Sequence, residues 1–132
     1  MLRILHIEDC LEDAFLIEQA AADQGITAHF TVVRSESEFL SALETNQYDV
    51  VLSDSGVPGF NLFNAMKAVR EKFPGVSYIC LSGLDDPRHI EKSLAAGATD
   101  YISKNDLFRL FVVLRQEQER LKSHRRNENG GG

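Results

Sequence analysis

Side chains that can carry out acid, metal or phosphoryl chemistry stand where four short apolar runs of this chain end. They are Glu8 and Asp9, Asp54, Ser82 and Lys104. Three neighbouring carboxylates repel one another and favour a hard divalent cation such as Mg²⁺, which prefers oxygen ligands. A carboxylate can also attack a phosphoryl group, while Mg²⁺ and a lysine neutralise charge on the transferring oxygens. These residue types therefore indicate phosphoryl transfer, provided that the fold brings them together.

Five short runs rich in β-branched and aromatic residues predict the strands that must position them. The runs are residues 3–8, 28–34, 49–53, 76–82 and 99–103. The second and third are nearly continuous in apolar residues, which predicts burial on both faces. The second run ends without chemically notable side chains, so we expect it at the edge of the sheet.

Helical patterns separate these runs. Leu11, Phe15, Leu16 and Ala20 recur at helical spacing, and Ser35 with Glu38 forms a capping box before the second helix. Phe108 and Val112 lie beside the apolar stripe of the last helix; we expect core packing for them, with an exposed partner-binding patch as the alternative. The alternation predicts an α/β fold, (βα)₅, with a doubly wound, five-stranded parallel sheet. Ligands bind such a sheet at the carboxyl ends of its strands, where the residues named above stand.

Each of these polar residues also has an ordinary structural interpretation. Asp9 could cap the first helix, Asp54 could belong to a simple turn, and Ser82 and Lys104 could be surface residues. Their coincidence on one rim of the sheet favours a single site over independent accidents.

Composition limits the remaining classes of function. The chain has 132 residues, which suits one domain, and 14 basic against 20 acidic side chains give a net charge of −6. An acidic body argues against direct nucleic-acid binding, and no apolar run approaches the roughly 20 residues that cross a bilayer. The N-terminus lacks the apolar core of a signal peptide, so we expect a cytoplasmic protein. We expect one domain over residues 1–121 and a polar, Gly-ended tail over residues 122–132, a linker or a cloning remnant.

Taken together, these motifs resemble the receiver domain of bacterial two-component response regulators, a flavodoxin-like fold. The resemblance covers roughly residues 2–121. It rests on Glu8-Asp9, on Asp54 followed by Pro58-Gly59, on Ser82-Gly83, and on the stretch from Gly97 to Lys104.

The resemblance implies a role for each matching residue. Asp54 matches the phospho-acceptor, and Lys104 the lysine that pairs with the acceptor and the phosphoryl group. Asp9 matches the direct Mg²⁺ ligand, Glu8 a neighbour acting largely through metal-bound water, and the Gly56 carbonyl a further ligand beside Asp54. Ser82 matches the switch hydroxyl and Tyr101 the aromatic rotamer switch. In the family, Ser82 moves toward the phosphoryl group and the aromatic ring turns inward, which remodels the face of the fourth helix, fifth strand and fifth helix.

The resemblance also implies partners. A sensor histidine kinase or a phosphotransfer protein would donate the phosphoryl group, and an output domain would be attached or separate. A homodimer through the remodelled face is possible. The domain modifies itself and is not a turnover enzyme.

Three positions depart from the family pattern or refine it. Asn105 stands where the family usually has a proline after a cis peptide bond; a cis bond before a non-proline costs about 2.5–4 kcal/mol, so we expect a trans bond and a reshaped loop. Gly56 and Leu84 occupy the positions that tune phosphoryl lifetime. Neither side chain can hydrogen-bond an attacking water, which predicts slow self-dephosphorylation.

Two alternatives remain open at this point. The first is a pseudo-receiver, an interaction module that never uses phosphate. The second is a haloacid-dehalogenase-like phosphatase, which would need a second aspartate two residues after Asp54, where Gly56 stands.

Overall fold

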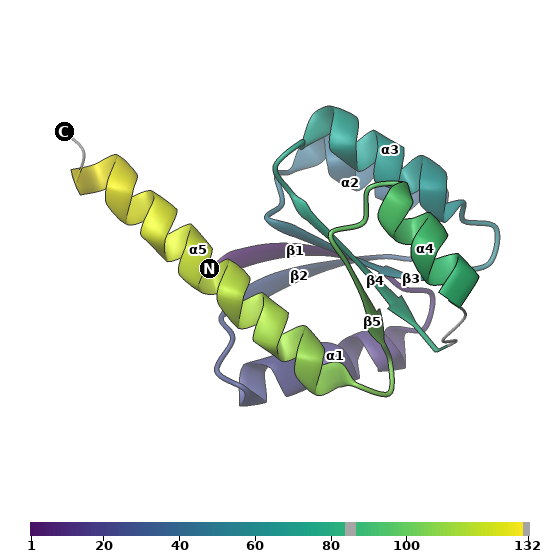
Figure 1. The fold of residues 1–132 in the computed structure, drawn as a ribbon, viewed down its shortest axis with the longest axis horizontal. Coiled ribbons are helices and arrows are strands. Elements are labelled where there is room, and N and C mark those ends of the chain that lie inside the picture. Colours follow the sequence, from purple (N-terminus) through teal and green to yellow (C-terminus); the bar gives the residue numbers. More distant parts are fainter. Residues whose placement is uncertain (84–86, 131–132) are drawn as a thin grey trace.

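The structure, a computed structural model, describes residues 1–83 and 87–130, with side chains as far as Ser123. Five strands alternate with five helices (Figure 1). The strands are β1 (Leu2–Ile7), β2 (Ala28–Val33), β3 (Val50–Asp54), β4 (Ser77–Ser82) and β5 (Asp100–Ser103). The helices are α1 (Leu11–Asp23), α2 (Glu36–Thr45), α3 (Leu62–Lys72), α4 (Pro87–Ala95) and α5 (Leu107–Gly130).

All strand pairs are parallel, and the strand order is β2-β1-β3-β4-β5. α2, α3 and α4 cover one face of the sheet, with Phe39 and Met66 in its core, while α1 and α5 cover the other, with Ile17 and Leu110 (Figure 1). This arrangement confirms the predicted doubly wound (βα)₅ fold.

The strands differ in burial according to their place in the sheet. All residues of β3 and β4 are buried because each strand has two neighbours and a helical layer on both faces. β2 lies at the edge, as expected, but only Val33 of it is fully buried. The prediction that this strand is buried on both faces was therefore wrong. An edge strand has a neighbouring strand on one side only, so most of its side chains stay partly exposed even though the run is rich in apolar residues.

The helix starts follow local chemistry. Ser35 Oγ accepts a hydrogen bond from the Glu38 backbone N–H at 3.2 Å, which confirms the predicted cap of α2. The predicted apolar stripe of α1 is not its core face. Leu11, Phe15 and Leu16 are exposed, and α1 buries Ala14, Ile17 and Ala21 instead.

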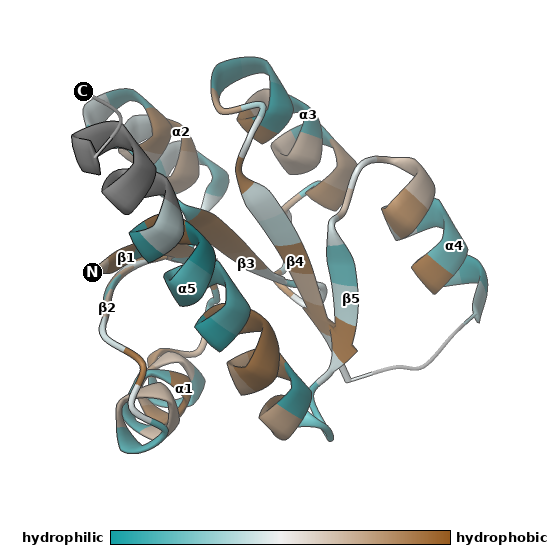
Figure 2. Ribbon diagram, turned by 60° about the vertical axis from the view of Figure 1, so that its left-hand side comes forward, coloured by the Kyte–Doolittle hydropathy of each residue, from teal (hydrophilic) through white to brown (hydrophobic). Residues whose placement is uncertain are grey.

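α5 begins as a core helix and continues as a polar one. Figure 2 shows apolar turns near its start and hydrophilic turns further along. The predicted core packing of Phe108 was wrong, since 64% of its surface is exposed, while Val112 is half-buried. α5 runs on to Gly130, and the proposed domain boundary at residue 121 stays a prediction. No helix in the described part of the chain is long and apolar enough to cross a membrane.

Candidate functional site

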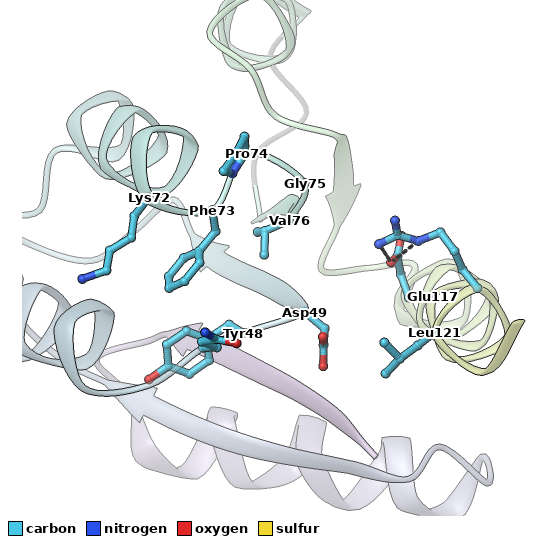
Figure 3. Close-up of a pocket in the computed structure, with 11 residues that line it drawn as sticks. Tyr48, Asp49, Lys72, Phe73, Pro74, Gly75, Val76, Glu117 and Leu121 are labelled. Carbon is cyan, nitrogen blue, oxygen red and sulfur yellow. Dashed lines mark hydrogen bonds and ion pairs between the residues drawn. The ribbon is translucent and has the colours of Figure 1, made fainter. Parts of the chain in front are cut away.

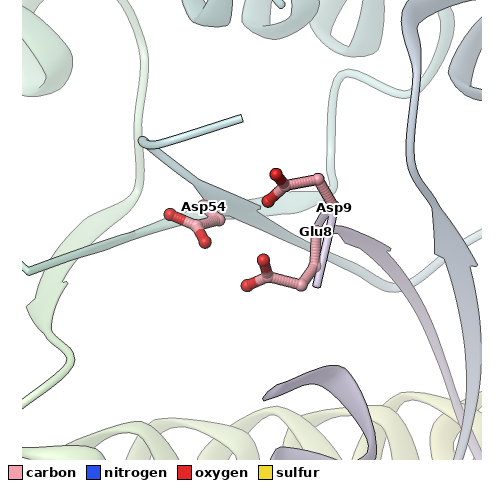
Figure 4. A group of neighbouring side chains, drawn as sticks. All are labelled: Glu8, Asp9 and Asp54. Carbon is pink, nitrogen blue, oxygen red and sulfur yellow. The ribbon is translucent and has the colours of Figure 1, made fainter. Parts of the chain in front are cut away.

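Three carboxylates meet at the carboxyl ends of β1 and β3. Parallel pairing places Ile7 opposite Ser53, so the next residue of each strand lies at the same rim. One oxygen from each of Glu8, Asp9 and Asp54 lies within 4.8 Å of the other two (Figure 4). The predicted juxtaposition of these residues is therefore present.

Lys104, the first residue after β5, reaches across to this cluster. Its Nζ lies 2.6 Å from Asp54 Oδ2 and 3.7 Å from Glu8 Oε2. The Lys104 backbone N–H donates to the Ser82 carbonyl at 2.8 Å, which anchors the residue beside β4. One ammonium group thus faces two carboxylates.

Glu8 and Asp54 are the two buried carboxylates of the cluster, and their pKa values are shifted in opposite directions. Glu8 is 1% exposed and Asp54 6% exposed. Burial, aided by a hydrogen bond to Asp54, raises the pKa of Glu8 well above its ordinary value. Burial by itself would also raise the pKa of Asp54, but hydrogen bonds from Glu8 and Lys104 outweigh it and hold that pKa below its usual range. Asp54 is therefore the ionised member of the pair, as a nucleophile must be.

Glu8 Oε2 accepts no hydrogen bond from any donor within the described ranges. The other oxygen, Oε1, accepts the Cys10 backbone N–H at 3.1 Å. Cys10 is the N-cap residue of α1, so the alternative that Asp9 caps this helix was wrong. Asp9 is left exposed at the mouth of the cluster.

The other candidate residues border the cluster. The Gly56 backbone N–H donates to Asp54 Oδ1 at 2.9 Å. Ser82 ends β4, 1% exposed, one position beyond the partner of Asp54 in the strand pairing. Tyr101 lies in β5 with its ring packed in the core under α2, α3 and α4, apart from the carboxylates. Leu84 lies outside the described residues.

The loop after Lys104 differs from the family pattern in the expected way. The peptide bond before Asn105 is trans. The Asn105 backbone N–H donates to Ser103 Oγ at 3.1 Å, a bond that a proline could not make.

Two histidines complete the surroundings. His6 is fully buried in β1, as its mid-strand position indicates, and burial lowers its pKa to about 4, so it is neutral near pH 7. His89 of α4 contacts the Tyr101 ring, with ring centroids 5.9 Å apart. The sequence gives no signal for this contact, because it depends on how α4 packs over β5.

A cavity of about 460 Å³ lies at the opposite rim, near the amino ends of β3 and β4 (Figure 3). Tyr48 and Phe73 line it together with Glu117, which accepts Ser77 Oγ–H at 2.6 Å and pairs with Arg120. In its lining, Asp49 is paired with Arg3 and Glu117 with Arg120, and the cavity is remote from the carboxylate cluster. The clustered carboxylates and the lysine that could carry out phosphoryl or metal chemistry lie at the other rim, at the carboxyl ends of the strands.

Comparison with known proteins gives a family and the same fold. The family model described as the response regulator receiver domain matches residues 4–114. The DNA-binding transcriptional regulator NtrC of Salmonella typhimurium is 28% identical over 98 residues, which cover 74% of this chain and 20% of that protein. The transcriptional regulatory protein PcoR of Escherichia coli is 28% identical over 104 residues, 79% of this chain and 45% of PcoR. The chain thus spans about a fifth of the length of NtrC and less than half of PcoR.

Solved structures share the architecture. A Francisella response regulator receiver domain superposes with a TM-score of 0.78 at 24% identity, covering 92% of this chain and 99% of that one. The Thermotoga maritima response regulator TrrA, in complex with Mg²⁺ and beryllium fluoride, gives 0.75 at 22% identity, covering 89% and 99%.

Proposed function

Because the chain belongs to the response regulator receiver domain family, we propose that it is a phosphorylation-controlled switch in which Asp54 accepts a phosphoryl group from a protein histidine. As a receiver domain it is a signalling domain of two-component systems and not a turnover enzyme.

One observation carries this proposal: the Asp54 carboxylate is held 2.6 Å from the Lys104 ammonium group, at a rim with two further carboxylates. In the transfer, a bond forms between an Asp54 carboxylate oxygen and phosphorus as the bond from phosphorus to the donor imidazole nitrogen breaks. The imidazole keeps that electron pair. Lys104 is positioned to neutralise charge on the transferring oxygens.

The donor set fits Mg²⁺. All its side-chain donors are carboxylate oxygens, and the buried Glu8 Oε2 has no hydrogen-bond donor among the described residues. Asp9, Asp54 and the Gly56 carbonyl would hold the ion, with Glu8 acting largely through metal-bound water. The ion, when bound, would neutralise negative charge on the phosphoryl oxygens.

The remaining roles follow the family pattern. Ser82, at the neighbouring strand end, would donate its hydroxyl to a phosphoryl oxygen. Tyr101 would change the face of α4, β5 and α5 through its ring position. That face would meet a partner, an output domain or a second copy of the chain.

The donor is proposed to be a sensor histidine kinase or a phosphotransfer protein. Support comes from the surface beside the site: Leu11, Phe15 and Leu16 of α1 are 53%, 59% and 63% exposed. A protein that brings its phosphohistidine to Asp54 would cover this apolar surface.

Intact-protein mass spectrometry after incubation with acetyl phosphate and Mg²⁺ tests the proposal. The natural chain and Asp23→Asn, a change of an exposed carboxylate at the far end of α1, should each gain one phosphoryl group. Asp54→Asn should gain none, and chelation of Mg²⁺ should abolish the gain. Uptake that persists in Asp54→Asn would refute the assignment. No uptake together with no Mg²⁺ binding would favour an interaction module that never uses phosphate.

A further inference from the structure

α4 is the most lightly anchored helix over the sheet. Ser93 is its one fully buried residue within the described part, and Leu94 is 45% exposed. Ile90 packs only partly against the core. Among the described residues, contacts at the two ends of α4 therefore help to fix its position.

The carboxyl end of α4 is held firmly by hydrogen bonds. The Ala98 backbone N–H donates to the Ser93 carbonyl at 3.0 Å, and the Arg70 guanidinium of α3 donates twice to the Gly97 carbonyl, at 2.7 and 3.2 Å. Arg70 also donates to Thr99 Oγ1 at the start of the path into β5. This end of α4 is thus tied to both α3 and β5.

The amino end is held in a different way. His89, in the first turn of α4, meets the ring of Tyr101 edge to face, with centroids 5.9 Å apart and planes at 77°. The Tyr101 residue is 7% exposed and belongs to the core cluster under α4. An edge-to-face aromatic pair shifts a two-state equilibrium by roughly 2- to 12-fold.

We propose that His89 is a positioning residue that keeps the Tyr101 ring packed inward before any phosphoryl group is attached. This inference rests on the proposed function, because it assigns a preset position to the ring that phosphorylation is expected to move. The consequence is a receiver whose α4–β5 surface already lies close to its switched form. Phosphorylation then has only a small further change to make in the position of the Tyr101 ring.

Fluorine NMR of the protein labelled with 3-fluorotyrosine tests this without phosphate. The chain has three tyrosines, and Tyr101→Phe identifies the resonance of interest. The change of each resonance between H₂O and D₂O reports the exposure of its ring. Tyr48 and Tyr78, both buried, report whether each variant is folded.

In the natural chain, Tyr101 should show the small solvent effect of Tyr48 and Tyr78. His89→Ala should lower the ratio of inward to outward ring by roughly 2- to 12-fold, with a correspondingly larger solvent effect on Tyr101 alone. His89→Phe should restore the natural value. Glu91→Ala, a change of an exposed residue two positions further along α4, should leave it unchanged. His89→Gln removes the ring and keeps a polar side chain, so it replaces His89→Ala if that variant does not fold.

A Tyr101 resonance that is the same in the natural chain, His89→Ala and His89→Gln would overturn the proposal. So would a large solvent effect on Tyr101 in the natural chain itself. Adding beryllium fluoride and Mg²⁺ should change Tyr101 more in His89→Ala than in the natural chain. Phosphoryl uptake by Asp54 is measured separately by mass, so failure of the phosphorylation chemistry and failure of the His89 contact give different results.

Discussion

The raised pKa of Glu8 makes Mg²⁺ binding depend on pH in a predictable direction. At an effective dielectric constant of about 20, a second carboxylate within 4.8 Å opposes ionisation of Glu8 by at least about 3.5 kcal/mol. Lys104 Nζ, at 3.7 Å, returns about 4.5 kcal/mol by the same arithmetic. Since the first figure is a lower bound for one of two neighbouring carboxylates, Lys104 offsets only part of the repulsion. The lost hydration of a side chain that is 1% exposed adds to it and raises the pKa of Glu8.

A divalent cation reverses this balance, because two positive charges outweigh the cost of ionising Glu8. Binding must therefore release a proton wherever Glu8 is protonated in the metal-free protein. Between the ordinary pKa of a glutamate and the raised pKa of Glu8, apparent Mg²⁺ affinity should rise with pH by up to about tenfold per pH unit. Above the raised pKa the affinity should level off.

Isothermal titration calorimetry at pH 7, in two buffers of different ionisation enthalpy, counts the released protons. The natural chain and Glu12→Gln, an exposed control in the first turn of α1, should release close to one proton per Mg²⁺. Glu8→Gln should release close to none, and its affinity should vary little between pH 6 and pH 8. A natural chain that binds Mg²⁺ without releasing protons at pH 7 would show that Glu8 is ionised beforehand, and the argument from burial would be wrong.

The other predictions concern lifetime and stability. With Gly56 beside the acceptor, the phosphorylated protein should persist for minutes or longer in Mg²⁺ buffer; loss within seconds would contradict this. A Cβ at position 56 would lie 3.5 Å from Asp54 Oδ1, so Gly56→Asn should shorten the lifetime by placing an amide there, whereas Gly56→Ala should not. Leu52→Ala, at a fully buried position of β3, should cost about 2–5 kcal/mol in urea unfolding, and Leu16→Ala, at an exposed one, within about 0.5 kcal/mol. Arg70→Ala should cost about 1–3 kcal/mol by removing the donor to the Gly97 carbonyl; an unchanged midpoint would indicate that water replaces it.

The fold and the acidic rim could be predicted because both depend on short-range patterns. Strand and helix periodicity fixes the alternation, and parallel strands bring their carboxyl ends to one edge. Glu8, Asp9 and Asp54 then meet whatever the details of packing, and Lys104 needs only the end of β5 beside them.

What the sequence did not predict depends on which side of an element faces the core. Leu11, Phe15 and Leu16 have helical spacing, yet the smaller Ala14 and Ala21 face the sheet with Ile17, since they allow α1 to approach it closely. The half-burial of β2 depends on strand order, which periodicity does not encode. The contact of His89 with Tyr101 depends on the placement of a whole helix.

β5 is the element through which the acidic rim and the surface around α4 are connected. Lys104 follows it and pairs with Asp54 at 2.6 Å, while Tyr101 within it contacts His89 of α4. The strand has four residues and a single neighbour, β4, whereas β3 is fully buried between two strands. Fewer backbone hydrogen bonds must change to displace a short edge strand than a central one. A change of charge at Asp54 is therefore expected to reach α4 through Lys104 and β5, with β3 and β4 acting as the rigid frame against which that strand moves.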